Sequence, residues 1–345
     1  MSLTTRKPTG KPPWPVALIA GVEKAGKSYA AAEASASPLI DRTFWFTQGE
    51  DDPDEYGALP GARFEIVVYD GTFRDLYLKM KEAAAEPMDP ARPHLWVLDS
   101  ATKLWDLISD MAQVEKNRRW AKRQQNNGAK AAEVVPGDGL RIDMDLWNVA
   151  RSRWDGVLEL MTKHQGPSII TARLEKKAIV DEATGEPTKF KDWKVLAQKQ
   201  LPFEVGVVIE LHARGEAYLT GVRSLRFKPE QARTPYPDFT MDDLWRKLGL
   251  ADAEAVGPRI HVQVTGEQSA SADDLIVARR GELLNQLLEV ARTARVTAER
   301  LAEKWLEEHG HDIRVTTDIG SLELMLDDLR TYANNRNAEQ QKDVA

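Results

Sequence analysis

The stretch that decides the fold reads Gly21-Val22-Glu23-Lys24-Ala25-Gly26-Lys27-Ser28. It fits the pattern G-x-x-x-x-G-K-[ST], in which a glycine-rich loop joins a strand to a helix. The apolar residues 15–20 before it predict a short buried strand, and residues 29–34 after it predict the first turns of a helix. This setting favours a phosphate-binding loop over the alternative, a glycine-containing turn with an ordinary surface lysine.

A loop of this kind binds phosphate because its backbone N–H groups and the helix N-terminus face the phosphate oxygens. Lys27 is expected to reach the β- and γ-phosphates, and the Ser28 hydroxyl is expected to ligate Mg²⁺. We therefore expect residues 21–28 and the adjacent Tyr29 to bind a nucleoside triphosphate.

The composition is that of a soluble globular protein. The 345 residues carry a net charge of −7 and are 42% hydrophobic, enough for one large domain and a smaller unit. The absence of cysteine excludes disulfides, cysteine-ligated zinc and thiol catalysis, and the six histidines lack metal-ligand spacing. The sequence shows neither an apolar run of membrane-spanning length nor a signal peptide, so we expect a cytoplasmic protein.

Strands and helices alternate after the phosphate-binding loop, which predicts an α/β fold with a mostly parallel sheet. An antiparallel pair of strands is expected near the end of this region, at 205–211 and 217–222. Strands are predicted at 43–47, 64–69, 94–100 and 168–173, and helices at 73–85, 103–125 and 143–164.

Acidic residues follow two of the predicted strands. Asp99 comes directly after the apolar residues 95–98, where a carboxylate that positions the metal is needed, although capping of the next helix is the alternative. A second carboxylate must act as general base or orient water. Glu50, Asp51 and Asp52 follow the strand at 43–47, and the pattern alone does not separate them. Ser28, Asp99 and Glu50 are the candidate metal ligands.

In this order, the elements resemble those of RecA-like P-loop ATPases. The shared features are residues 21–28, the acidic loop at Glu50, the strand ending at Asp99 and the strand at 168–171. More narrowly, residues 14–228 are similar to phage-encoded RecA-like ATPases and single-strand annealing proteins. The resemblance implies a RecA-like fold, ATP and Mg²⁺ as cofactors, binding of single-stranded or forked DNA, and a homo-oligomeric ring or filament such as a hexamer. It also implies a role in phage recombination, annealing or replication, in the host cytoplasm.

The resemblance assigns roles to further residues. Glu50 stands where RecA-like ATPases have their catalytic glutamate, and Thr171 or Arg173 stands where a polar residue senses the γ-phosphate. Arg223 or Arg226, in the segment after the last strand, could reach the γ-phosphate of a neighbouring subunit, because the arginine fork is rigid and always charged. Simple surface charge is the alternative for both arginines.

Two basic segments, one beginning at Lys116 and the other at Lys176, are candidate DNA-binding tracks. Cations in such segments can contact phosphates, and aromatic rings can stack on bases. The second segment flanks a predicted hairpin that turns at 182–185, and it also contains Lys189, Lys191, Lys194 and Trp193. The alternative for the first segment is a solvated helix with Trp120 packed inward. The candidate DNA contacts are Lys116, Arg118, Arg119, Trp120, Lys122 and Arg123 in the first segment, and Lys176 and Lys177 in the second.

We divide the chain into five parts: a flexible arm at 1–13, a RecA-like ATPase domain at 14–255, a linker at 256–273, a helical module at 274–335 and a tail at 336–345. The leading interpretation is a DNA-stimulated ATPase. A DnaB-type ring helicase would share the same site, and an ATP-gated assembly module would bind without turnover. A Mg²⁺- or Mn²⁺-dependent nuclease could draw its ligands from Glu50, Asp51, Asp52, Asp54 and Asp99.

Overall fold

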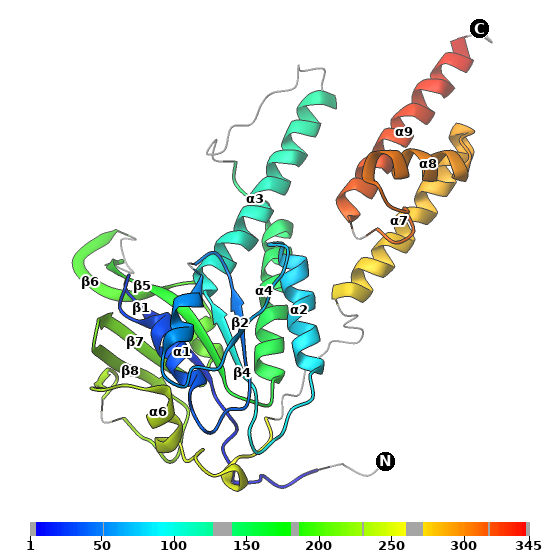
Figure 1. Cartoon of the computed structure of the whole chain (residues 1–345). Coiled ribbons are helices and arrows are strands. Elements are labelled where there is room, and N and C mark those ends of the chain that lie inside the picture. Colours follow the sequence, from blue (N-terminus) through cyan, green and yellow to red (C-terminus); the bar gives the residue numbers. More distant parts are fainter. Residues whose placement is uncertain are drawn as a thin grey trace. The chain divides into compact units, whose positions relative to one another are not determined.

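The computed structural model describes residues 5–50, 52–126, 140–180, 186–229, 231–259, 272–316 and 318–342 of the chain. The chain divides into two compact units, Met1–Val262 and Gln263–Ala345. The described residues of the first unit form two apolar core clusters, and those of the second unit form another. Figure 1 shows the helices and strands of both units.

Within the described residues, the first unit is built on a nine-stranded sheet (Figure 1). The strand order is β3-β2-β4-β5-β1-β7-β8-β9, and β6 pairs with β5. All pairs among β1 to β5 and the pair β1–β7 are parallel, whereas β6, β8 and β9 join antiparallel. The strands are β1 Val16–Gly21, β2 Thr43–Thr47, β3 Glu65–Ile66, β4 Leu95–Asp99, β5 Ser168–Val180, β6 Pro187–Leu196, β7 Val207–Ala213, β8 Glu216–Val222 and β9 Thr234–Pro235.

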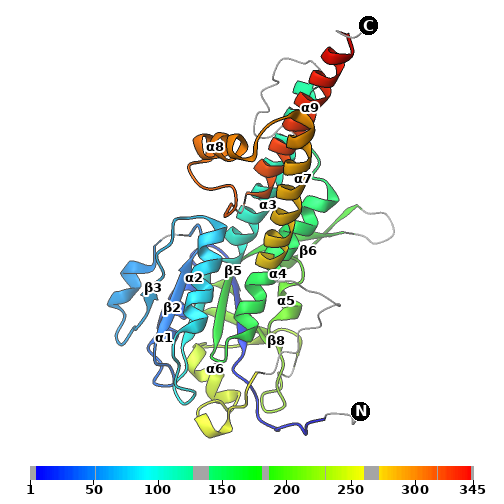
Figure 2. The same ribbon diagram turned by 90° about the vertical axis from the view of Figure 1, so that its right-hand side faces the viewer.

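Helices cover both faces of this sheet (Figures 1 and 2). In β1, Ala17 and Ile19 face a core that includes α1 and α6, whereas Leu18 and Ala20 face a core that includes α2, α3 and α4. Burial on both faces explains why the central strands read as continuous apolar runs. The helices are α1 Lys27–Ser35, η1 Pro53–Ala58, α2 Phe73–Ala85, α3 Ala101–Asn126, α4 Met144–Lys163, α5 Leu201–Glu204, α6 Met241–Lys247 and η2 Ala253–Ala255.

The fold class predicted from the sequence is confirmed: the sheet is mostly parallel, helices cover both faces, and further helices follow at the C-terminus. Two strand boundaries were wrong. Only Glu65–Ile66 of the expected strand 64–69 pairs as a strand, at the sheet edge beside β2. The strand expected to end at 173 continues to Val180, because β6 pairs with it along the hairpin.

The described residues near both ends of the first unit pack against the rest of that unit. In the expected linker, the Gly257 backbone N–H donates to the Pro12 carbonyl at 2.9 Å. The Arg259 guanidinium donates to the carbonyls of Met161 at 2.9 Å and Gly166 at 3.2 Å, and burial lowers the pKa of Arg259 to about 10. The first unit therefore extends at least to Arg259; residues 260–271 lie outside the described part.

The second unit contains α7 Ala272–Ala294, α8 Ala298–His309 and α9 Ile319–Lys342. Leu287, Trp305 and Leu326 are among its buried residues. The Thr297 hydroxyl accepts from the Arg300 backbone N–H and caps α8. The last helix continues into the segment expected to be a tail. None of the described helices in either unit is both long and apolar enough to span a membrane.

Candidate nucleotide-binding site

The P-loop connects β1 to α1 at the carboxyl edge of the sheet. Gly26 precedes α1 with a φ of 99°, in the left-handed region that favours glycine. A Cβ at Gly21 would lie 3.0 Å from both the Leu211 Cβ and the Lys27 Cγ, which leaves no room for a larger residue without displacement. Backbone geometry therefore explains both glycines of the motif.

Asp99, at the end of β4, is buried and accepts hydrogen bonds from two hydroxyl groups. The Ser28 Oγ donates to its Oδ2 at 2.8 Å, and the Thr171 Oγ1 donates to its Oδ1. Burial raises the pKa of Asp99, and the bonds from Thr171 and Ser28 oppose that rise. A hydroxyl and a carboxylate are oxygen ligands that suit Mg²⁺, so Ser28 and Asp99 fit a metal that also contacts nucleotide phosphates.

Glu50 enters the same site from the loop after β2. Its Oε1 accepts from the Ser100 Oγ at 2.8 Å and from the Arg173 Nε at 3.2 Å, and its Oε2 accepts from the Arg173 Nη2 at 3.1 Å. Partial burial disfavours the carboxylate, but the hydrogen bonds from Arg173 and Ser100 lower the pKa of Glu50 overall. Glu50 is therefore an ionised carboxylate close to Asp99.

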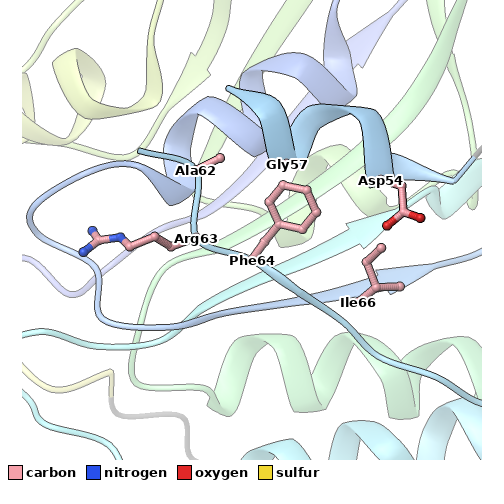
Figure 3. Close-up of a pocket in the computed structure, with 6 residues that line it drawn as sticks. All are labelled: Asp54, Gly57, Ala62, Arg63, Phe64 and Ile66. Atoms are coloured by element: carbon pink, nitrogen blue, oxygen red, sulfur yellow. The ribbon is translucent and has the colours of Figure 1, made fainter. Parts of the chain in front are cut away.

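The other described acidic residues of this loop make different contacts, although Asp52 lines the same cleft as Glu50. Asp52 accepts from the Asp54 backbone N–H at 3.1 Å and caps η1, and Asp51 lies outside the described residues. Asp54 lines a separate hollow of about 380 Å³, and Figure 3 shows Asp54 and Arg63 at its opposite ends. In the part of the chain that is described, no group of three or more His, Cys, Asp or Glu side chains could hold a metal ion.

Lys27 is the first residue of α1, at the end of the P-loop. Its Nζ donates to the Val22 carbonyl at 3.1 Å. Burial lowers the pKa of Lys27, while the carboxylates of Glu50 and Asp99 act in the opposite direction. The carboxylates of Glu50 and Asp99 are therefore close enough to act on the charge of the Lys27 ammonium group.

One cleft of about 1310 Å³ is lined by Lys27, Ser28, Glu50, Asp99 and Arg173, together with Tyr29. Sequence reasoning missed many further lining residues, among them Tyr56, Lys103, Arg214 and Phe239. Lys103 could have been found from its place in the first turn after Asp99. Arg214 lies in the β7–β8 turn, at the P-loop edge of the sheet because β7 runs parallel to β1. Tyr56 and Phe239 come from segments without a motif.

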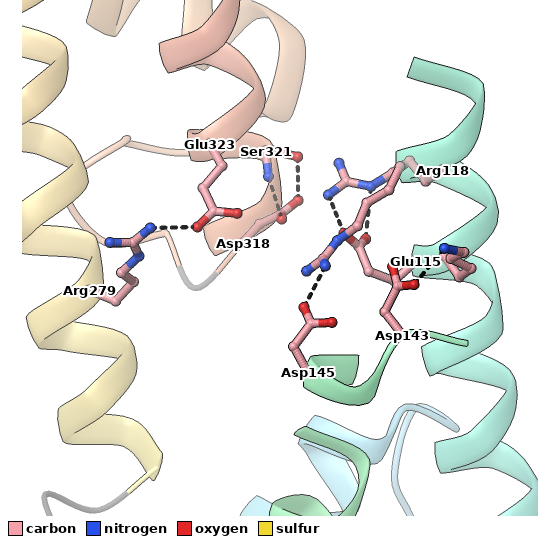
Figure 4. A network of polar contacts seen from close by, with 10 residues as sticks. Glu115, Arg118, Asp143, Asp145, Arg279, Asp318, Ser321 and Glu323 are labelled. Atoms are coloured by element: carbon pink, nitrogen blue, oxygen red, sulfur yellow. Dashed lines mark hydrogen bonds and ion pairs between the residues drawn. The ribbon is translucent and has the colours of Figure 1, made fainter. Parts of the chain in front are cut away.

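The basic end of α3 is largely neutralised by carboxylates of the same chain (Figure 4). Lys116 pairs with Asp143 at 2.7 Å, and Arg118 pairs with Glu115 at 2.9 Å. Arg119 pairs with Glu115 at 3.0 Å and with Asp145 at 2.6 Å. These contacts join α3 to the start of α4. Of the remaining predicted contacts in this segment, Trp120 and Lys122 are half-buried and Arg123 is exposed.

The second basic segment forms the β5–β6 hairpin. The Lys176 Nζ lies 4.6 Å from the Trp193 ring centroid, and Lys177 pairs with Glu175 at 3.3 Å. Trp193 stacks on His212 of β7 with 4.2 Å between ring centroids, which fixes the base of the hairpin to the sheet. Farther out, apolar side chains are exposed: Ile179, Val180 and Phe190.

The structure places Arg223 and Arg226 at the opposite edge of the sheet from the P-loop. Val222, at the end of β8, pairs with Val207 at the start of β7, and the Arg223 backbone N–H donates to the Gly206 carbonyl at 2.8 Å. The Arg226 Nη1 donates to the Gly249 carbonyl at 2.9 Å. Neither arginine belongs to the nucleotide cleft of its own chain.

No protein-family model matches the sequence, and no curated protein matches it. Among solved structures, the RadB recombinase matches with 14% sequence identity and a TM-score of 0.37. The match covers 66% of this chain and 89% of the RadB chain. A likeness at this level carries no argument about activity, so the functional conclusions rest on the site itself.

Proposed function

We propose that the protein binds ATP with Mg²⁺ and hydrolyses it. The observation that carries the proposal is the convergence of Ser28 and Thr171 on Asp99, with Glu50 beside them and the P-loop adjoining. A phosphate-binding loop, a metal-positioning pair and a carboxylate base are the parts that transfer of a phosphoryl group to water needs.

Each residue has a distinct task in this proposal. Backbone N–H groups of the P-loop and the Lys27 ammonium bind the β- and γ-phosphates. Ser28 and Asp99 would hold Mg²⁺, which offsets the negative charge of the phosphates when bound. Glu50 orients a water molecule and accepts its proton, a task for which its lowered pKa keeps it ionised at neutral pH. Thr171 holds Asp99 in orientation.

We further propose that hydrolysis is coupled to single-stranded DNA, in recombination, annealing or replication. The support is the motif order that resembles RecA-like ATPases, and the hairpin that starts at Arg173 and exposes Lys176 and Phe190. The proposal includes a phage origin, action in the host cytoplasm and a homo-oligomer. In a ring or filament, Arg223 or Arg226 would serve the nucleotide of a neighbouring subunit rather than its own.

The test is ATP hydrolysis by the wild-type protein and by Lys27→Ala, each with and without single-stranded DNA. We expect turnover that DNA stimulates and that Lys27→Ala abolishes. Turnover indifferent to DNA would remove the coupling and leave the ATPase. Intact ATP binding without any turnover would select the ATP-gated assembly module, and directional unwinding of forked DNA would select the DnaB-type helicase.

A further inference from the structure

Both carboxylate oxygens of Glu50 already accept hydrogen bonds, although a general base needs an oxygen available to accept a proton. Its Oε1 already accepts from Ser100 and from the Arg173 Nε, and its Oε2 accepts from the Arg173 Nη2. Two parallel bonds from a guanidinium are among the stronger and more directional contacts that a carboxylate makes. A carboxylate held in this way has to give up a bond before it can take the proton of a water molecule.

Arg173 also lies where a bound nucleotide would draw it away. It lines the same cleft as the P-loop, and its side chain is 45% exposed, so it is free to reorient. Lys27 and Arg173 line this cleft together. The guanidinium therefore lies in the cleft where Lys27 would meet phosphate. A triphosphate would compete with Glu50 for it, since arginine binds phosphate oxygens as readily as carboxylates.

We propose that Arg173 is a positioning residue that holds Glu50 until the terminal phosphate of a nucleoside triphosphate takes the guanidinium. The inference rests on the proposed function and adds a regulation of that site. A diphosphate lacks the terminal phosphate and leaves the contact between Arg173 and Glu50 intact. The base is thereby released only when the substrate is in place.

The hairpin is connected to this contact through the first turn of α3. The Thr102 Oγ1 accepts from the Arg173 backbone N–H at 2.9 Å and donates to the carbonyl of Leu196, at the end of β6. Ser100, which binds Glu50, lies two residues before Thr102. A ligand that moves the root of the hairpin would thus move Arg173 relative to Glu50.

The test is a double-mutant cycle on nucleotide affinity with Glu50→Gln and Arg173→Gln. The probes are a non-hydrolysable ATP analogue and ADP, each with Mg²⁺. We expect Glu50→Gln to bind the triphosphate analogue about three- to tenfold more tightly than wild type, in the lower part of the range for residues in contact, because Arg173 is freed. ADP affinity should not change, and in the Arg173→Gln background the gain should disappear.

Arg214→Gln is the matched control, because Arg214 lines the same cleft but, among the described residues, forms no hydrogen bond or ion pair with Glu50. The gain from Glu50→Gln should persist in that background. A gain that persists equally with Arg173→Gln would overturn the proposal in favour of simple charge repulsion. If Arg173→Gln fails to bind ADP, Arg173→Met, which also removes the charge, replaces it in the cycle. Failure of the wild-type protein to bind either nucleotide would instead refute the ATPase proposal.

Discussion

Two hydroxyl groups meet at Asp99 because of the order of three strands. The strand β5 lies between β1 and β4, so Thr171 is next to Asp99, and the P-loop helix brings Ser28 from the other side. A buried carboxylate without such donors would be costly, since burial disfavours its charged form. The same contacts that stabilise Asp99 in the fold therefore also orient it for a metal.

Replacing Thr171 by valine should destabilise the protein, because a buried carboxylate loses a hydrogen-bond donor. We expect the free energy of unfolding in urea to fall by about 1–3 kcal/mol. Thr43→Val is the matched control: Thr43 is also a fully buried strand residue, but its Oγ1 has no hydrogen-bond partner in the described structure. That variant should be neutral or stabilising. Equal effects of the two substitutions would contradict this account.

His164 makes stability depend on pH. Its ring stacks on Trp96 with 4.5 Å between centroids, and its Nε2 donates to the His94 carbonyl at 2.8 Å. Burial lowers the pKa of His164 to about 3. Because the unfolded value is higher, about 6.5, the neutral ring contributes its full stability above pH 6.5 and loses it progressively as the pH falls toward 3.

We therefore expect the free energy of unfolding to fall between pH 7 and pH 5 by on the order of 1–2 kcal/mol more in the wild-type protein than in His164→Gln. Urea denaturation at the two pH values measures the difference. The same pH dependence in both proteins would show that His164 does not carry it.

At the scale of elements, the β5–β6 hairpin and the end of α3 differ in how much charge they offer a partner. In α3, Lys116, Arg118 and Arg119 hold carboxylates of the chain itself. The hairpin exposes Phe190, whose ring is 64% accessible and lies 5.5 Å from the Lys189 Nζ. A cation beside an exposed aromatic ring suits a single strand, where bases stack and phosphates alternate with them.

Phe190→Ala should weaken binding of single-stranded DNA about tenfold or more, because base stacking on an aromatic side chain is lost. Fluorescence anisotropy of a labelled oligonucleotide measures the affinity. Phe203→Ala is the matched control, since Phe203 is 88% exposed but lies just before β7, at the edge of the sheet away from the P-loop. Similar losses in both variants would remove the hairpin from the binding surface.

Local pattern was enough to predict the elements that follow one another in the sequence. Asp99 and Glu50 were candidates because each comes at or just after the end of an apolar strand, and parallel strands end at one edge of a sheet. Thr171 was a candidate only through the resemblance. The contact between Arg173 and Glu50 joins residues 123 positions apart and leaves no local signal. The antiparallel pairing of β7 and β8 was predicted, and it already implied that Arg223 lies at the opposite edge.

The ion pairs of α3 could be predicted only in part from the sequence. Glu115 stands three and four residues before Arg118 and Arg119, a helical spacing that predicts pairing. Asp143 and Asp145 belong to the start of α4, and only the antiparallel packing of α3 and α4 brings them to Lys116 and Arg119. A sequence count of basic residues therefore overestimates the charge available to DNA.

At the scale of the molecule, the first unit should fold without the second, because its two cores contain no residue beyond Val256. A polypeptide of residues 1–262 should unfold as the first unit does in the whole chain. A polypeptide of residues 1–255 lacks Arg259 and the hydrogen bonds of its guanidinium to four backbone carbonyls. Its free energy of unfolding should therefore be lower by about 3 kcal/mol or more. Equal urea midpoints for the two polypeptides would contradict this boundary.

The central claim is that Glu50 is the base of an ATP-hydrolysing site built around Asp99. The most direct test is steady-state ATP hydrolysis by Glu50→Gln, with Mg²⁺–ATP binding measured on the same sample. We predict retained binding and a turnover at least about 100-fold below wild type, the lower end of what a general base contributes. Turnover near the wild-type rate, with binding intact, would contradict the account and return the choice of base to the rest of the acidic loop.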